Sequence, residues 1–290
     1  MLRQHAGKRC TLEIAVRTGN CWHPLIAKLY CRDRSDVFDA MRSIQQAGFG
    51  SEEEFSIPQP LACHSSLKCL VQEKVEGPRG DEIFKNGDER SHAATAERCA
   101  LWLARFHVFG PKAGEACYPR DHLSSDSVRR SSREIAKAGG TLMGKATQLL
   151  RRLEEASRSL SAVALCPSHG SYSAAQVMLS EGRTVAFDWD RYCVADPAQD
   201  VGRFLTALRR LALVQHGSIK ALDKAADLFL KTYLAVGRPE AVKNLHFFAA
   251  TGYMKWAKHL VCHPVPRWEE HSETILNEGL AVLDGGALHG

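Results

Sequence analysis

The sequence predicts an α+β protein with a small strand-rich N-terminal part and a larger helical C-terminal part. Three observations support this prediction. Apolar and polar residues alternate over 10–16 and return over 24–30 after a turn at 18–20, as in half-buried strands. From residue 92 onward, apolar residues recur at helical spacing. Within this helical part, β-branched and apolar runs around a Glu-Gly turn predict one β-hairpin at 177–189.

The composition is that of a soluble globular protein. The chain has 290 residues, of which 44% are hydrophobic and 24% charged, with a formal net charge of +5. This length allows one large or two medium domains. The ten cysteines are scattered without a CxxC pair, which indicates reduced thiols in a cytoplasmic protein.

The sequence pattern argues against two classes of partner, membranes and nucleic acids. The chain shows neither the apolar core of a signal peptide nor a run of 18 apolar residues, so we expect no membrane partner. An arginine-rich stretch at 129–152 lacks interleaved aromatic residues and any nucleic-acid-binding motif. We therefore expect no nucleic-acid partner and interpret this stretch as a solvated helical face.

The predicted N-terminal strands carry two candidate binding residues. Lys28 lies in the second strand within LIAKLY, where a lysine either extends to solvent or meets a ligand. The segment HAGKR precedes the first strand, and Gly7 in it could offer backbone N–H groups to a phosphate. A frayed basic chain end is the other interpretation of that segment. Little sequence precedes it, so we expect a shortened sheet.

A helix and a further strand complete the predicted N-terminal part. Ser35 resembles a helix N-cap, and apolar residues follow at helical spacing up to Gly48, with Asp39 as the acid inside the helix. Residues 67–75 read as a strand that runs into a Gly-Pro turn. A domain boundary is expected near Val75.

The segment 168–202, SHGSYSAAQVMLSEGRTVAFDWDRYCVADPAQDVG, gathers most of the candidate functional side chains. The predicted hairpin has polar residues before its first strand and Asp188 and Asp190 at the end of its second. Carboxylates two residues apart in a strand point to the same face. Such a pair suits a divalent cation such as Mg²⁺, which takes one or two carboxylates and leaves its other positions to water and phosphate.

Three short motifs in this segment resemble the catalytic core of the aminoglycoside phosphotransferase and choline kinase families. HGSYSAAQV, AFDWD and DPAQD stand in the order and at the intervals of the family pattern, in which H-G-D is followed by N or Q, then D, then D-P-x-x-D. The resemblance implies a two-lobed protein-kinase-like fold, with an N-lobe at 1–75 and a C-lobe at 76–290. The sequence departs from the pattern at Ser171, which stands where these families have a catalytic Asp.

The resemblance implies ATP and Mg²⁺ as cofactors and assigns residues to them. Lys28 and Gly7 would hold the phosphates, and the backbone of Glu73 and Val75 would receive the adenine. In these families an acid on the first helix holds the strand lysine, a role that falls on Asp39. The metal ligands implied are Gln176 and Asp188.

The resemblance also assigns catalytic roles. His169, Ser171 and Asp190 are the catalytic candidates, and Asp190 would add a metal ligand or replace the missing base. Asp200, in the DPAQD motif, would brace the catalytic loop through its backbone N–H groups; the simpler interpretation is a helix N-terminal acid.

The function predicted is transfer of the ATP γ-phosphoryl group to the hydroxyl of a small-molecule acceptor. Ser171 is expected to slow it, because a hydroxyl lacks the basicity of a carboxylate and general-base assistance contributes about 10²–10⁴-fold. The alternative is a pseudokinase, a binding or regulatory module with a protein partner. A cleft repurposed for another reaction is the third possibility.

The predicted C-terminal helices cover 92–110, 218–236, 241–261 and 268–283. His107 is interpreted as a core residue, and His259 and His263, four residues apart, as structural residues rather than metal ligands. The last helix carries four glutamates without basic partners; acids here would suit the polycationic acceptor of an aminoglycoside kinase, but solvated glutamates are the more common explanation. They are Glu269, Glu270, Glu273 and Glu278.

Overall fold

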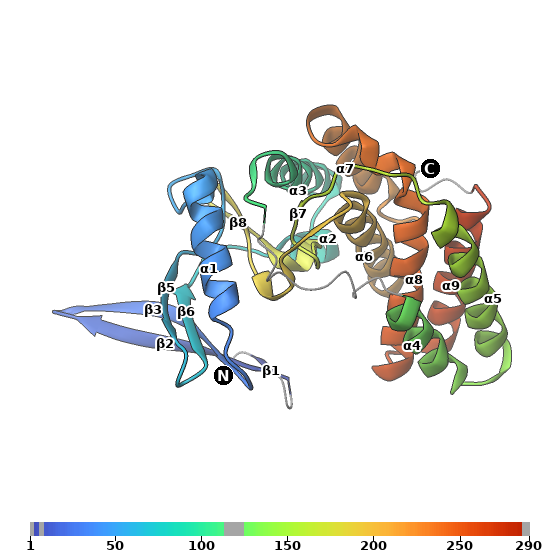
Figure 1. The fold of residues 1–290 in the computed structure, drawn as a ribbon, viewed down its shortest axis with the longest axis horizontal. Coiled ribbons are helices and arrows are strands. Elements are labelled where there is room, and N and C mark those ends of the chain that lie inside the picture. The colour runs from blue at the N-terminus through green and yellow to red at the C-terminus, as the bar shows by residue number, and fades with distance from the viewer. Residues whose placement is uncertain (1–2, 6–8, 113–124, 286–290) are drawn as a thin grey trace.

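The computed structural model describes residues 3–5, 9–112 and 125–285. A strand-rich part at the left of Figure 1 is joined to a larger helical part at the right. The prediction of an α+β protein with this division is confirmed. Among the described residues, no helix is long and apolar enough to cross a membrane.

The strand-rich part is one antiparallel sheet with the order β1-β2-β3-β6-β5. Its long hairpin projects from the molecule at the left of Figure 1. Helix α1, Ser35–Ile44, packs near β5 and continues into a π-helical turn, Gln45–Phe49. Both predicted strands of the hairpin are confirmed and extend by a few residues. The strands are β1 Arg3–His5, β2 Arg9–Thr18, β3 Cys21–Tyr30, β5 Pro60–His64 and β6 Cys69–Glu73.

A second sheet links the two parts of the chain. Strand β4, Phe55–Ser56, pairs in parallel with β9, Arg183–Ala186, which in turn pairs with β8, Val177–Ser180. The predicted hairpin is therefore present, but its second strand ends at Ala186 rather than at residue 189. Beyond that point Asp188 adopts a left-handed backbone with φ 72°, and Trp189–Arg191 forms a 3₁₀ turn.

Helices make up most of the remaining chain. Helix α9 has the predicted bounds, whereas α7 and α8 begin five and four residues later than predicted because short turns precede them. Strands β7, Cys166–Ser168, and β10, Cys193–Ala195, precede and follow the hairpin in the chain and pair with each other. The helices are α2 Gly80–Asn86, α3 Glu89–Phe109, α4 Ser125–Ala136, α5 Gly140–Ala156, α6 Ala198–His216, α7 Asp223–Val236, α8 Leu245–Cys262 and α9 Trp268–Leu283.

An aromatic cluster anchors loop 168–176 to the helices. Tyr172 lies in this loop, is fully buried and stacks on Trp102 of α3 and Phe204 of α6. Its hydroxyl donates to the carbonyl of Cys99 at 2.8 Å. Offset-stacked rings of this size bury large apolar areas and leave few alternative packings. The loop is therefore held by the core itself and not only by hydrogen bonds.

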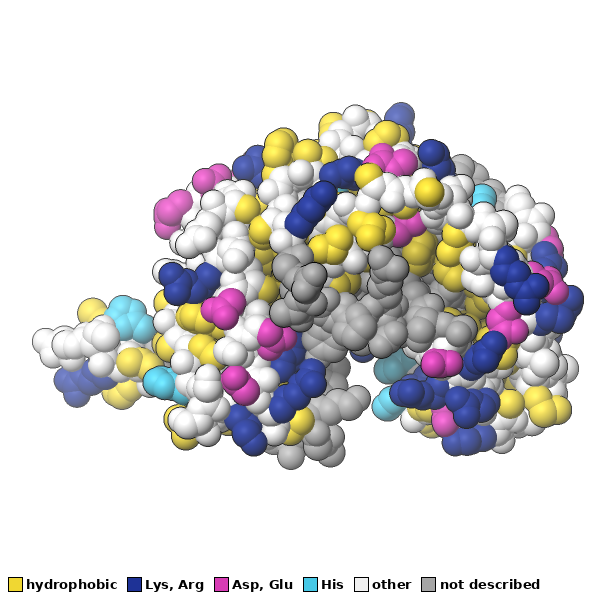
Figure 2. All heavy atoms as spheres, in the orientation of Figure 1, with side chains coloured by type: hydrophobic (Ala, Val, Ile, Leu, Met, Phe, Trp, Pro, Cys, Tyr) yellow, Lys and Arg dark blue, Asp and Glu magenta, His cyan; other side chains and the backbone are white. Residues whose placement is uncertain are grey.

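Basic and acidic side chains lie side by side on the helical surface. Figure 2 shows Lys and Arg side chains interleaved with Asp and Glu over the helices at the right. In the arginine-rich stretch, Arg129 pairs with Glu154 and Arg151 with Glu155, as expected for a solvated face.

The prediction that the last helix has glutamates without basic partners is wrong for three of the four. Glu270 pairs with Arg267, just before the helix, Glu273 with Lys145 of α5, and Glu278 with Arg209 of α6. Two of these partners lie on other helices, where a reading of α9 alone could not find them.

The described histidines and cysteines form no metal centre. The rings of His259 and His263 stack at 4.7 Å, and no group of three potential ligands of the His, Cys, Asp or Glu type is found within the described ranges. His107 is fully buried, as predicted. The nine described cysteines are free thiols.

Candidate active site

The two carboxylates after the hairpin converge on one arginine. Nη1 of Arg9 lies 2.5 Å from Oδ1 of Asp188 and also donates to Oδ2 of Asp190. Nη2 of Arg9 donates to the second oxygen of Asp188 at 2.9 Å. A planar guanidinium suits such a bidentate contact. The two carboxylates thus converge on one guanidinium group. The predicted convergence is present, but it comes from the turn at Asp188 and not from alternation along a strand.

The register of the N-terminal hairpin brings further groups to this point. Arg9 lies opposite Tyr30, and Lys28 lies two residues before Tyr30 on the same strand face. The buried Nζ of Lys28 is 3.5 Å from Asp188 and 3.6 Å from Asp190. The Tyr30 hydroxyl donates to Asp190 at 2.8 Å. Both oxygens of Asp190 therefore already accept hydrogen bonds.

Electrostatics favour the ionised form of Asp188. Burial by itself raises the pKa of Asp188, but the charge of Lys28 and the hydrogen bond and charge of Arg9 outweigh it, so the pKa is lowered. Burial and the Asp190 carboxylate raise the pKa of Tyr30, which keeps this hydroxyl a donor. The cluster therefore sets two carboxyl groups against a guanidinium and an amine.

Asp200 braces loop 168–176. This fully buried carboxylate accepts the backbone N–H of His169 at 2.7 Å and that of Tyr172 at 3.4 Å. It also accepts the hydroxyl of Ser168 at 2.8 Å and lies 3.4 Å from Nε2 of His107. Burial raises the pKa of Asp200, but the hydrogen bonds and charges of its partners outweigh it and lower the pKa. The acid is therefore ionised and holds the loop.

Gly170 allows the loop to approach the carboxylates. Its φ is +73°, a region that favours glycine, and a Cβ added there would lie 2.1 Å from the carbonyl oxygen of Arg191. No side chain fits in that space. The loop backbone consequently packs directly on the segment that follows Asp190.

Ser171 is hydrogen-bonded to a neutral histidine. Its Oγ lies 3.1 Å from Nδ1 of His169, whose Nε2 lies 3.0 Å from the carbonyl oxygen of Phe187. A carbonyl only accepts, so Nε2 carries the proton and Nδ1 accepts from the Ser171 hydroxyl. Complete burial lowers the pKa of His169, in agreement with a neutral ring.

The other predicted site residues are placed as follows. Gln176 lies in a 3₁₀ turn, and its Oε1 accepts from the Ser173 hydroxyl. The backbone N–H of Glu73 donates to the carbonyl oxygen of Gln59 at 2.8 Å and its carboxylate pairs with Arg183, while the use of its backbone for adenine stays a prediction. Val75 is buried at the end of the connection from β6. Gly7 lies outside the described residues.

The assignment of Asp39 as the partner of Lys28 is wrong. Asp39 is exposed on α1, and its carbonyl accepts from Ser43. Lys28 turns instead toward the two carboxylates that follow the hairpin.

Sequence reasoning missed the role of Arg9 and Tyr30 at the carboxylates. Tyr30 could have been found, since it alternates with Lys28 on one strand face. Arg9 could not, because only the pairing of β2 with β3 brings it opposite Tyr30.

Comparison with known proteins identifies the family and the fold. A family model described as the phosphotransferase enzyme family matches residues 14–228. A search of curated protein sequences found no match. The structure resembles an amicoumacin kinase solved with AMP-PNP, Ca²⁺ and its substrate, at TM-score 0.67 and 13% identity, covering 99% of this chain and 88% of that one.

Two further structures extend this likeness. A glucosamine kinase with glucosamine, ADP and phosphate has TM-score 0.66 and 15% identity, over 95% of this chain and 82% of the other. A choline/ethanolamine kinase family protein from Mesorhizobium loti has TM-score 0.59 and 14% identity, over 94% and 85%. At these identities the likeness establishes the two-lobed kinase-like fold alone.

Proposed function

Because this chain belongs to the phosphotransferase enzyme family, we propose that it transfers the γ-phosphoryl group of ATP to the hydroxyl of a small molecule. The observation that carries the proposal is the convergence of Lys28, Asp188 and Asp190 beside a loop braced by Asp200. Phosphoryl transfer depends on positioning and on neutralising phosphate charge. This arrangement supplies a lysine that can pair with phosphate and carboxylates that can hold a metal ion. Lys28 would contact phosphate oxygens.

The carboxylates suit a divalent cation. Arg9 lies where such a cation would bind, because its Nη1 contacts Asp188 and Asp190 at once. Oxygen ligands of this type are those that Mg²⁺ prefers. Asp188 and Asp190 would hold the ion, with Gln176 as the further amide ligand that the family resemblance implies, and the ion would neutralise phosphate charge. For this, Arg9 has to release the carboxylates and can then pair with phosphate.

His169 offers a replacement for the missing base. Its unprotonated Nδ1 accepts the Ser171 hydroxyl, so Ser171 can take a proton from an acceptor hydroxyl while passing its own to His169. The lowered pKa of His169 makes it a weak base, and we expect slow transfer. Asp190 is a poorer candidate because Tyr30 donates to one of its oxygens and the ion would take the other.

Arg9 also favours a second candidate, a pseudokinase that binds nucleotide without a metal ion. A guanidinium that stays between the carboxylates would leave no position for a divalent cation. Such a protein would act as a binding or regulatory module.

Thermal unfolding with ATP tests the nucleotide site. We expect ATP with Mg²⁺ at 100 times its Kd to stabilise the wild type by about 2.7 kcal/mol. Asp188→Ala should lose this shift, because it removes the carboxylate that faces Lys28. Asp39→Ala, which removes an exposed carboxylate on α1, is the matched control and should keep it. No shift in the wild type at millimolar ATP contradicts the proposal, and a shift that is equal with and without Mg²⁺ favours the metal-free pseudokinase.

Replacement of Arg9 tests the competition for the carboxylates. Arg9→Gln removes the guanidinium charge, so Mg²⁺ should stabilise the protein at a concentration lower by roughly 10- to 100-fold, one charge-assisted contact being worth about 1.5–3 kcal/mol. The measurement is a Mg²⁺ titration followed by thermal unfolding. Arg17→Gln, on the exposed end of the same strand, is the control. An unchanged Mg²⁺ midpoint in Arg9→Gln would show that Arg9 and the metal do not compete.

A further inference from the structure

A pocket beside the catalytic loop is lined by three cationic side chains. Arg191 of the 3₁₀ turn, Arg203 of α6 and Lys255 of α8 line it together with Gly170, which directly precedes Ser171 in the chain. No Asp or Glu is among its described lining residues. Three basic side chains therefore meet a few residues from the candidate catalytic side chains.

Two buried polar atoms in the lining have no hydrogen-bond partner among the residues that the structure describes. These are Nε of Arg203 and Oγ1 of Thr251, whose side chain is fully buried. A buried donor without a partner costs about 1–3 kcal/mol. Nε of Arg203 can only donate, so its missing partner is an acceptor, and the Thr251 hydroxyl can donate to the same group.

Like charges lie close together in this pocket. Burial first, and then the charges of Arg203 and Arg191, lower the pKa of Lys255 to about 7. Burial and the charge of Arg191 lower the pKa of Arg203 to about 10, even though Asp200 and Asp188 attract it. A bound anion would relieve this repulsion.

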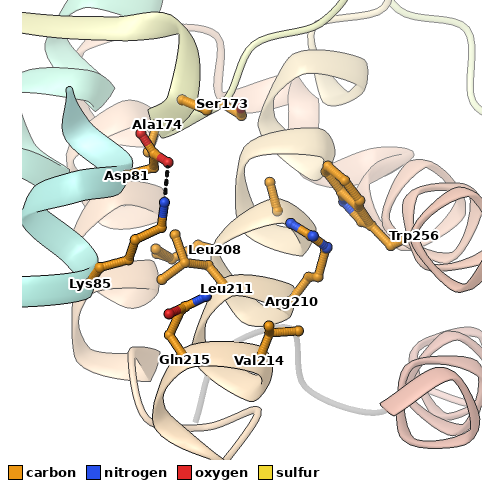
Figure 3. A pocket seen from close by; sticks show the side chains of 12 residues that line it. Asp81, Lys85, Ser173, Ala174, Leu208, Arg210, Leu211, Val214, Gln215 and Trp256 are labelled. Atoms are coloured by element: carbon orange, nitrogen blue, oxygen red, sulfur yellow. Dashed lines mark hydrogen bonds and ion pairs between the residues drawn. The ribbon is translucent and has the colours of Figure 1, made fainter. Parts of the chain in front are cut away.

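A second pocket lies near the first. It is a cavity of about 150 Å³ between α2, α6 and α8, with Arg210 and Trp256 in its wall (Figure 3). The guanidinium groups of Arg203 and Arg210 lie 5.6 Å and 4.7 Å from the same Trp256 ring, which makes the two pockets neighbours. Arg210 has a buried Nε without a hydrogen-bond partner among the described residues.

Asp81, the acid in the second pocket, does not pair with Arg210. Asp81 is bonded to Lys85 at 2.7 Å (Figure 3), and Arg210 has no ion pair with an acid among the described residues. Together the two pockets form a basic region, consisting of Arg191, Arg203, Arg210 and Lys255, next to the loop that carries Ser171.

We propose that this basic region binds a carboxylate or phosphate group of the phosphoryl acceptor, so that the acceptor is an anionic alcohol. The inference rests on the proposed function for the acceptor role, whereas the anion site stands on its own residues. The anionic group would be held by Arg203, Lys255 and Thr251, which leaves a hydroxyl of the same molecule to reach Ser171. A cationic acceptor would meet like charges here and is disfavoured.

The test uses inorganic phosphate as the probe for the site, at fixed ionic strength, with thermal unfolding of the full chain as the readout. We expect phosphate to stabilise the wild type, and Arg203→Gln to weaken phosphate binding by about tenfold or more. Lys255→Gln is a second, independent variant in case Arg203→Gln folds poorly. Arg151→Gln, an exposed arginine paired with Glu155 on α5, should bind phosphate as the wild type does.

A second experiment asks whether the anionic group that binds here belongs to the acceptor or to the nucleotide. The non-hydrolysable analogue AMP-PNP with Mg²⁺ should stabilise Arg203→Gln as much as the wild type, and its shift should add to that of phosphate. If Arg203→Gln loses the AMP-PNP shift, the site holds a nucleotide phosphate and the acceptor assignment is overturned. Absence of a phosphate shift in the wild type overturns the anion site itself.

A third arm tests the acceptor chemistry by ATP consumption with glucose, glucosamine and glucose 6-phosphate, which differ in the charge of one substituent. We expect the phosphate ester to be the preferred acceptor, and preference for glucosamine would overturn the proposal. A phosphate shift in a wild type that shows no AMP-PNP shift keeps the anion site but overturns its role in phosphoryl transfer. The failure of this inference and that of the proposed function are thereby distinguished.

Discussion

A Ser171→Asp variant is expected to consume ATP about 10²–10⁴ times faster than the wild type, which is the usual contribution of general-base catalysis. Ser171 occupies a loop that Asp200 and the aromatic cluster already hold in place. A carboxylate there would face a substrate hydroxyl with far greater basicity than a serine. The measurement is steady-state ADP formation, with water and with a panel of neutral, cationic and anionic alcohols as acceptors.

Ser171→Asn is the matched control for this prediction. It has the size and shape of the aspartate variant but no basic oxygen, so it should remain at the wild-type rate or below it. Equal gains in both variants would show that shape and not basicity limits the reaction. If neither variant gains with any acceptor, the pseudokinase is the better description, because the missing base would then not be what limits turnover.

Asp200→Asn is expected to destabilise the protein by about 3–5 kcal/mol, as measured by urea unfolding, because a buried charge network loses its central acceptor. The carboxylate accepts two backbone N–H groups and the Ser168 hydroxyl. An amide can present only one oxygen to these donors, and its NH₂ group would face a donor. Asp39→Asn, at an exposed position, should change the free energy of unfolding by less than about 0.5 kcal/mol.

The pH dependence gives this prediction a second readout. The folded protein lowers the pKa of Asp200 below that of an unfolded aspartate, about 4. Its contribution to stability is therefore complete above pH 4 and is lost as the pH falls through the folded pKa. The stability difference between wild type and Asp200→Asn should shrink below pH 4. A difference that stays constant at low pH would mean that the ionised carboxylate is not its source.

The family resemblance and much of the fold could be predicted from the sequence because they depend on short-range patterns. Strand alternation around the turn at Gly19, the helical spacing within α9 and the three motifs near the hairpin each involve residues close together in the chain. The place of Asp200 in the DPAQD motif also indicated its role at the loop.

What only the tertiary structure decided involves residues far apart in the chain. Arg9 meets Asp188 and Asp190 across separations of 179 and 181 residues, through the register of the β2–β3 hairpin. The left-handed backbone of Asp188, and not strand alternation, brings the carboxylates together. The basic region likewise joins α6, α8 and the turn after Asp190. Side-chain convergence of this kind depends on packing between elements, which local sequence patterns do not encode.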